Sequence, residues 1–194
     1  MKYDVAIIGG GPAGSTVGSL IRLYNPSLKV LILERERFPR DHIGESQLPA
    51  ISPILHEMGV WDKVEAAEFP IKVGATYRWG QTDDLWDLEF LNQSEKFMGA
   101  PRPNKFEGQR RKTAFQVDRS IYDKILLDHA LELGCEVYEG VKVAKVLHEE
   151  DHVLGLQAVP TNPGTPTAVP DLEGNALVER KMGELTRQAR ESSS

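Results

Sequence analysis

The sequence has only one cysteine in 194 residues, Cys135, and this excludes an intramolecular disulfide and a cysteine-based metal cluster. Its five histidines show no zinc-ligand spacing, so we predict no metal site. No apolar run approaches the roughly 18 residues that a membrane span needs. The sequence also has fewer basic than acidic residues, with 23 Lys and Arg and 29 Asp and Glu. The resulting net charge of −6 argues against general nucleic-acid binding.

The remaining composition is that of an ordinary globular protein, with 40% hydrophobic and 27% charged residues. The length suits one domain, or one domain plus a tail. The N-terminus enters an apolar run without a basic-then-apolar leader, so we expect a cytoplasmic protein. Cys135 follows Gly134 where a helix should give way to a strand, which favours a buried structural thiol over a reactive one.

The first fifteen residues organise the chain. Residues 3–8 form a short apolar run rich in branched side chains, and a helical pattern starts directly after Gly14. A glycine turn between strand and helix is the context that makes G-x-G-x-x-G a dinucleotide fingerprint. In that fingerprint the first glycine permits the tight turn, the second lets the backbone approach a pyrophosphate, and the third lets the helix pack closely. The predicted contacts with the nucleotide, near the positive end of the helix, are Gly9, Gly11, Pro12, Ala13 and Gly14.

The second half of the fingerprint is an acid. Residues 29–33 predict the next buried strand, and Glu34 follows it, twenty residues after Gly14. A carboxylate at this place accepts both hydroxyls of an adenosine ribose. Arg35 lies at the same adenosine end of the predicted site, with a solvated charge as the alternative interpretation. The alternative for the whole pattern is a glycine turn followed by a coincidental acid.

A long polar stretch, residues 35–46, comes next, where a plain NAD domain has a short loop and a crossover helix. It ends in a Gly-Glu-Ser turn. We interpret it as a loop that runs beside an extended cofactor toward its reactive ring, and the alternative is a solvated charged loop.

These motifs together resemble a known group of flavoproteins. Residues 9–14, Glu34, the R-F-P-R of residues 37–40 and the H-I-G-E-S-Q-L-P of residues 42–49 resemble the FAD-binding half of tryptophan halogenase-like flavoproteins. That group lies within the superfamily of aromatic hydroxylases and geranylgeranyl reductases. In such enzymes the Gly-Glu-Ser segment lies near the flavin, and the preceding arginine contacts the cofactor. The resemblance implies FAD as cofactor and contacts from Arg40, Gly44, Glu45 and Ser46.

Residues 71–80 predict a strand, and residues 87–91 a partner strand, with the turn at residues 81–84. Two paired strands after a dinucleotide motif fit part of an inserted substrate-domain sheet that shields the flavin. Trp79 and Trp86 are candidates for lining that site, although aromatic core residues on a sheet are commoner.

Lys72 is the candidate catalytic residue. The segment from Lys72 to Trp79 resembles the strand on which flavin-dependent halogenases carry a lysine that holds or relays hypochlorous acid. A buried lysine beside an apolar pocket is suited to such chemistry. The alternative, and the more common case for a lysine, is an exposed strand residue.

A further cofactor segment is predicted before the last long helix. Residues 113–118 indicate a strand, Asp118 a helix N-cap, and Gly134 the end of the helix. The F-Q-V-D-R of residues 115–119 resembles the superfamily, in which the glutamine and the arginine approach FAD. The resemblance therefore implies Gln116 and Arg119 as cofactor contacts. For Arg119 the alternative is an exposed first-turn charge.

The other elements complete an α/β fold. We predict helices over residues 48–58 and from residue 60 to about 69, a strand at residues 135–138, and an antiparallel hairpin from residues 141–147 and 152–159. The expected fold is a Rossmann-like FAD-binding domain over residues 1–159, with a parallel sheet, this hairpin, and inserted substrate-domain strands and loop over about 70–112. Residues 160–194 are linker-like and weakly helical.

The resemblance stops at about residue 157. A later D-A-S-G-like turn, a G-D motif and the halogenase W-x-W-x-I-P signature are all absent from the sequence. We therefore interpret the chain as the front portion of an FAD-dependent oxidoreductase, halogenase- or monooxygenase-like, that acts on a small organic substrate and takes a flavin reductase as partner. The alternatives are a non-catalytic remnant or binding module, and an NAD(P)-dependent reductase. Uncovered sheet edges and apolar surface also predict self-association.

Overall fold

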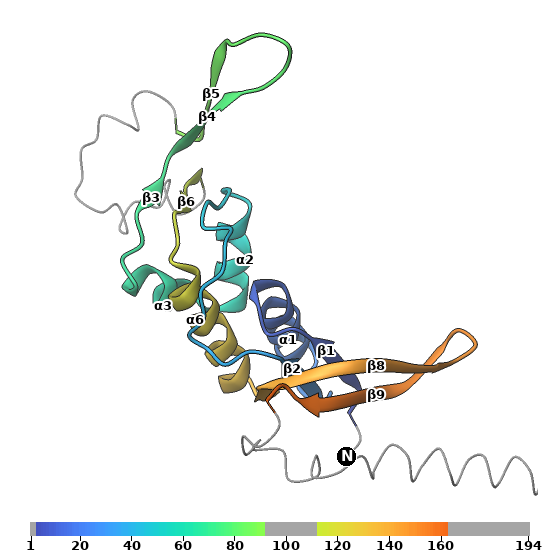
Figure 1. Cartoon of the computed structure of the whole chain (residues 1–194). Coiled ribbons are helices and arrows are strands. Elements are labelled where there is room, and N and C mark those ends of the chain that lie inside the picture. Colours follow the sequence, from blue (N-terminus) through green and yellow to red (C-terminus); the bar gives the residue numbers. More distant parts are fainter. Residues whose placement is uncertain (1–2, 92–111, 163–194) are drawn as a thin grey trace, which may run out of the picture. The chain divides into compact units, whose positions relative to one another are not determined.

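The computed structural model describes residues 3–91 and 112–162, and the elements below belong to these residues (Figure 1). The chain divides into two compact units, which we describe one at a time. Unit 1 comprises Met1–Phe38 and Ala130–Ser194, and unit 2 comprises Pro39–His129. The loop predicted within the inserted segment of about 70–112 and the tail predicted from residue 160 lie mostly outside the described residues. No helix of the described ranges is long and apolar enough to span a bilayer.

Unit 1 is built on a three-stranded parallel sheet in the order β1-β2-β7. Strand β1 (Val5–Ile8) pairs with β2 (Val30–Glu34), and β2 pairs with β7 (Glu136–Glu139). Every residue of β2 is buried, as the continuous apolar run predicts for a strand between two parallel neighbours. Helix α1 (Pro12–Tyr24) connects β1 to β2 and lies along them (Figure 1). The predicted strand, glycine turn, helix and second strand are thus confirmed.

Two glycines let α1 approach the sheet. A Cβ on Gly14 would lie 1.9 Å from the carbonyl oxygen of Gly9, and a Cβ on Gly18 would lie 2.9 Å from the Ile32 side chain and 3.2 Å from the sulfur of Cys135. The Cys135 thiol is buried, and its burial raises its pKa. This agrees with the structural role expected for the thiol.

Replacing Gly14 by alanine should destabilise the protein by about 3 kcal/mol, because the new methyl group meets backbone that must move. Chemical denaturation of the two proteins measures this. Gly155→Ala is the matched control, since a Cβ there meets nothing within 4 Å, and it should change stability by no more than about 0.5 kcal/mol. Equal stabilities of the Gly14 and Gly155 variants would contradict the close packing of α1.

An antiparallel hairpin completes unit 1. Strands β8 (Val141–Glu149) and β9 (His152–Pro160) pair along their length, as predicted. Val141 packs with Leu31 and Leu33 of β2 in a buried cluster, against which Tyr138 and Val143 also pack. The hairpin thereby buries apolar side chains of the parallel sheet.

Unit 2 gathers three helices around one core. Three helices surround a buried apolar core, namely α2 (Ile51–Met58), α3 (Trp61–Ala66) and α6 (Arg119–Glu132). The last residues of α6 belong to unit 1. That core includes Leu55, Val64, Phe115, Tyr122 and Leu126. Helix α2 begins at Ile51 rather than at the predicted Leu48. Leu48 precedes Pro49, and helical backbone is disfavoured for a residue before a proline.

The predicted strand over residues 71–80 is two strands with different partners. Strand β3 (Ile71–Lys72) pairs with β6 (Ala114–Phe115), whereas β4 (Gly74–Arg78) pairs with β5 (Leu85–Glu89). The predicted partner strand is confirmed by the pairing of β4 with β5, two residues earlier than expected, whereas the prediction of one continuous strand over residues 71–80 was wrong. The cause is long-range pairing that a local pattern does not contain, since β6 lies about forty residues further along the chain.

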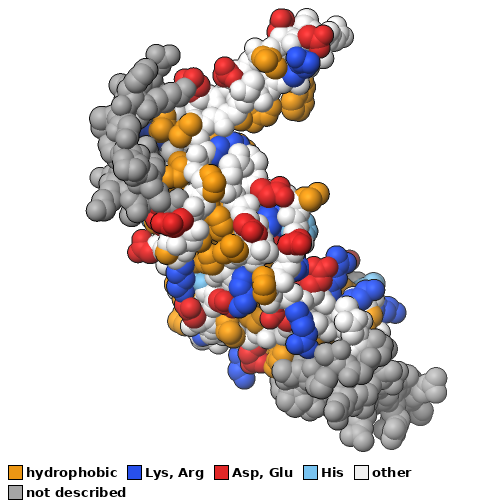
Figure 2. All heavy atoms as spheres, turned by 60° about the vertical axis from the view of Figure 1, so that its left-hand side comes forward, with side chains coloured by type: hydrophobic (Ala, Val, Ile, Leu, Met, Phe, Trp, Pro, Cys, Tyr) orange, Lys and Arg blue, Asp and Glu red, His pale blue; other side chains and the backbone are white. Residues whose placement is uncertain are grey.

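The hairpin of β4 and β5 has one apolar face. Tyr77 and Trp86 stack across it with ring centroids 4.7 Å apart, and Ala75 pairs with Leu88. Leu88 and Trp86 are exposed, and Trp79, at the end of β4, is 77% exposed. Figure 2 shows hydrophobic side chains gathered along one side of this hairpin. Trp79 and Trp86 thus contribute exposed aromatic surface rather than core.

Candidate functional site

The glycine turn of unit 1 places backbone N–H groups at the start of α1. Gly9 has φ +101°, a conformation that favours glycine, and its N–H donates to the Leu33 carbonyl at 2.8 Å. Gly11 is the N-cap, where no side chain accepts a hydrogen bond from the helix, and the first turn carries no acidic residue. Pro12 opens the helix and Ala13 follows it. This end of α1 therefore has the free N–H groups and partial positive charge that suit an anion.

Glu34 lies beside this turn at the end of β2, and its carboxylate is buried. One oxygen accepts the N–H of Gly10 at 2.7 Å, and the other accepts the N–H of Glu36 at 2.9 Å. Since each carboxylate oxygen can accept two hydrogen bonds, both retain capacity for a ligand. Glu34 thus fixes the turn in addition to the ribose contact predicted for it. Arg35 is largely exposed and lies 3.8 Å from Glu36, so its predicted contact stays a prediction.

The Gly-Glu-Ser loop, residues 44–46, belongs to unit 2. Gly44 has φ +100°, and the loop is attached to the segment that precedes α6. The Glu45 carbonyl accepts the N–H of Val117 at 2.9 Å, and Ser46 forms an isolated bridge with Gln116. The structure therefore brings the predicted cofactor residues Gly44, Glu45, Ser46 and Gln116 together.

Arg119, at the start of α6, holds the other side of this loop. Its Nη1 donates to the Ile43 carbonyl at 2.6 Å, while Nε and Nη2 donate to the two carboxylate oxygens of Asp123 at 2.6 and 2.9 Å. Arg40 lies 3.6 Å from the same carboxylate. The hydrogen bonds to Asp123 raise the pKa of Arg119 above its ordinary value. The Arg119 side chain is only 12% exposed, so the alternative of an exposed first-turn charge does not hold.

Sequence reasoning missed Asp123. The signal available was its spacing of four residues from Arg119, which places both side chains on one helix face, together with the apolar residues Tyr122 and Leu126 that accompany it. Its side chain is fully buried.

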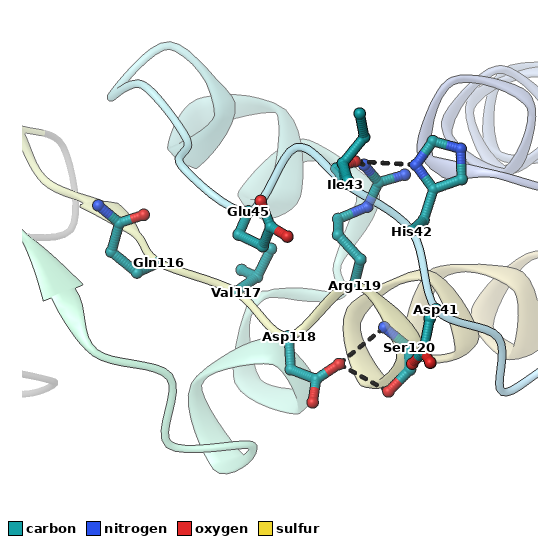
Figure 3. A pocket seen from close by; sticks show the side chains of 9 residues that line it. All are labelled: Asp41, His42, Ile43, Glu45, Gln116, Val117, Asp118, Arg119 and Ser120. Atoms are coloured by element: carbon teal, nitrogen blue, oxygen red, sulfur yellow. Dashed lines mark hydrogen bonds between the residues drawn. The ribbon is translucent and has the colours of Figure 1, made fainter.

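A hollow of about 680 Å³ adjoins this cluster (Figure 3). Residues 41–43 and Glu45 line it on one side, and residues 116–120 line it on the other. Figure 3 shows Arg119 directly beneath Ile43, with Glu45 and Val117 side by side. Asp118 caps α6 as predicted, because its carboxylate accepts hydrogen bonds from Ser120, and these lower the pKa of Asp118.

Lys72 contacts the same loop from β3. It is 8% exposed, and its Nζ donates to the Ser46 hydroxyl and to the Gln47 carbonyl, each at 2.9 Å. The ammonium also lies 5.5 Å from the centre of the Phe90 ring. An ammonium has three N–H donors, so beyond these two bonds one donor has no hydrogen-bond partner among the residues that the structure describes. Lys72 lines a second hollow, of about 510 Å³, with Gln116 and residues of β4 and β5. The alternative of an exposed strand lysine is thereby wrong.

Comparisons with known proteins identify relatives of this chain. The family model described as tryptophan halogenase matches residues 4–100. The chain is 43% identical over 147 residues to the 1H-pyrrole-2-carbonyl-[peptidyl-carrier protein] chlorinase of Pseudomonas fluorescens, a match that covers 74% of this chain and 32% of the relative. It is 34% identical over 142 residues to the tryptophan 2-halogenase of Chondromyces crocatus, covering 73% and 23%.

Solved structures give the same result. The FAD-dependent chondrochloren halogenase of a myxobacterium superposes with a TM-score of 0.66 at 36% identity, over 82% of this chain and 33% of that one. The flavin-dependent halogenase CmlS superposes with a TM-score of 0.63 at 36% identity, over 86% and 27%. The α/β fold with a parallel sheet is therefore confirmed. The chain spans a third or less of the length of these relatives. It belongs to the tryptophan halogenase family.

Proposed function

We propose that this chain forms the front part of a flavin-dependent halogenase, which uses FAD and halogenates a small organic molecule. The observation that carries the proposal is the burial of Lys72 against the Gly-Glu-Ser loop. Burial of a lysine costs the solvation free energy of its ammonium. A buried lysine beside a pocket is therefore a candidate for a chemical role.

The residues of unit 1 fit the ADP part of FAD. The N–H groups at the start of α1 suit the pyrophosphate, and Glu34, which already accepts the Gly10 N–H, has acceptor capacity left for ribose hydroxyls. Gly9, Gly11, Pro12, Ala13 and Gly14 form the turn at which the phosphates would lie.

The residues of unit 2 are proposed to contact the remaining part of the cofactor. Arg40 and Arg119 are held by one buried carboxylate, and Arg119 in turn holds the Gly-Glu-Ser loop. The chemistry that bound, reduced FAD would supply is its reaction with oxygen, and the halogenating agent would derive from that reaction. A flavin reductase would supply the reduced cofactor.

Lys72 is proposed to hold that agent. Its remaining N–H donor would bind the oxygen of hypochlorous acid, while Ser46 and Gln47 keep the ammonium in place. The Phe90 ring beside Nζ provides an apolar neighbour, which helps to keep water away from a reactive species. A hydroxylase needs no lysine at this point, so Lys72 favours the halogenase over the monooxygenase.

The experiment that tests the proposal is an exchange of segments. Residues 1–160 of this chain replace the matching segment of the Pseudomonas fluorescens chlorinase, to which the chain is 43% identical. With reduced FAD, oxygen and chloride, the hybrid should chlorinate the pyrrolyl carrier-protein substrate of that enzyme. A folded hybrid that binds FAD and oxidises reduced flavin but never chlorinates would contradict the proposal.

The chain should self-associate, because the apolar face of the β4–β5 hairpin is exposed around Trp79 and Trp86. Sedimentation velocity at increasing concentration measures the association. Trp79→Arg should reduce it, whereas Leu154→Arg, at an exposed apolar position of β9, should not. A parent chain that stays monomeric at every concentration would contradict this expectation.

A further inference from the structure

We infer that Asp123 is a positioning residue, which orients Arg119 and thereby holds the Gly-Glu-Ser loop closed against the segment before α6. The consequence for cofactor binding rests on the proposed function. The effect on the loop does not.

Asp123 carries a buried charge. The Asp123 side chain has 0% exposure and is matched by two arginines, Arg119 and Arg40. A buried carboxylate stays ionised only where partners compensate its lost solvation. The three side chains therefore form one cluster of paired charges. Asp123 is the only acidic member of this group of three, and both arginines contact its carboxylate.

Asp123 also fixes the orientation of the Arg119 guanidinium. The carboxylate accepts hydrogen bonds from Nε and Nη2 of Arg119. This bidentate contact fixes the plane of the guanidinium. With those two nitrogens engaged, Nη1 points to the Ile43 carbonyl at 2.6 Å and reaches the Gly44 carbonyl at 3.5 Å. Asp123 therefore determines which nitrogen faces the loop.

The Gly-Glu-Ser loop packs against this guanidinium. A Cβ on Gly44 would lie 3.0 Å from Nη1 of Arg119, so loop and guanidinium are in close contact. Beyond that point the Glu45 carbonyl accepts the Val117 N–H, and the Gln47 N–H donates to the Phe115 carbonyl. These two hydrogen bonds close the loop, and their protection from exchange reports whether it stays closed.

Hydrogen exchange of the ligand-free chain, read by NMR at individual amides, tests the inference. In Asp123→Asn the Val117 and Gln47 amides should exchange faster by about tenfold or more, beyond any change at the Leu126 amide of α6, which reports general stability. Asp128→Asn is the matched control. Asp128 pairs with Lys124 at the same four-residue spacing on the same helix, but this pair is only half-buried and does not contact the loop, so its loss should leave exchange at Val117 and Gln47 unchanged.

A second variant keeps the test decisive if Asp123→Asn does not fold. Arg119→Lys retains the positive charge beside Asp123 but cannot contact both the carboxylate and the Ile43 carbonyl in the same way. It should speed exchange at Val117 and Gln47, and Asp123→Asn should add less than about twofold in that background, because both changes act through one contact. Unchanged exchange at these two amides in Arg119→Lys, or acceleration in Asp123→Asn that is equal at Leu126, would overturn the inference.

Addition of FAD separates this inference from the proposed function. FAD should shift the Gly44 and Ser46 amide signals in the parent and in Asp128→Asn, and much less in Asp123→Asn. If FAD shifts no signal in the parent chain, the proposed function fails, whereas the exchange rates without ligand still decide the role of Asp123.

Discussion

Replacing Lys72 by alanine should lower chlorination by the hybrid enzyme by a factor of about 10² to 10⁴, the range found when a group that acts on a reacting atom is removed. Lys72 is buried, and its ammonium is held by Ser46 and Gln47 beside the Phe90 ring. The side chain is therefore placed for chemistry rather than for solubility. Reaction of the reduced flavin with oxygen should continue at its parental rate, because that step does not use the lysine. Product analysis and oxygen consumption, measured on the same sample, separate the two steps.

Two further variants make this result interpretable. Lys72→Met retains the length of the side chain and its packing near Phe90 but removes the ammonium, so it should lose chlorination as fully as alanine does. Arg78→Ala removes an exposed cation from the neighbouring strand and should leave chlorination intact. Chlorination retained by Lys72→Met would show that the match of this lysine to the halogenase strand is accidental.

The second large effect is expected at the glycine turn. Gly11→Val should weaken FAD binding by about a hundredfold or more, ~2.7 kcal/mol, because a branched side chain would occupy the place where the pyrophosphate approaches the backbone. Gly11 has φ −67°, which valine adopts readily, so the substitution should leave the fold intact. Titration with FAD, followed by NMR or by flavin fluorescence, measures the loss.

Gly155→Val serves as the control for this experiment. A Cβ at Gly155 meets nothing within 4 Å, and the position lies on β9, away from the turn. It should bind FAD like the parent. If Gly11→Val also binds FAD as tightly as the parent, the glycine fingerprint is structural only.

Local signals account for the parts of the fold that could be predicted. The apolar run before Gly9, the helix after it and the strand that ends at Glu34 each depend on neighbouring residues, and all three were confirmed. The same holds for the hairpin of β8 and β9 and for the N-cap at Asp118. The prediction over residues 71–80 failed because β3 pairs with β6, which lies far along the chain. A strand pattern does not indicate where the partner strand lies.

The candidate site divides in the same way. Gly44, Ser46, Gln116 and Arg119 were predicted from short motifs, and the structure gathers them in unit 2. The burial of Lys72 was not predictable, since it depends on Ser46 and Gln47, which lie 26 and 25 residues away. Asp123 was missed because a four-residue spacing on a helix is common and says nothing about burial.

The central claim, that the residues of this chain bind FAD, is tested most directly by comparing FAD with NADH in an NMR titration of this chain. Both cofactors contain ADP, so both should shift the amide signals of Gly9, Gly10 and Gly11 in unit 1. FAD alone should also shift those of Gly44, Ser46 and Arg119 in unit 2. If FAD leaves the unit 2 signals unmoved, or if NADH moves them equally, the chain does not carry a flavin site of the proposed kind.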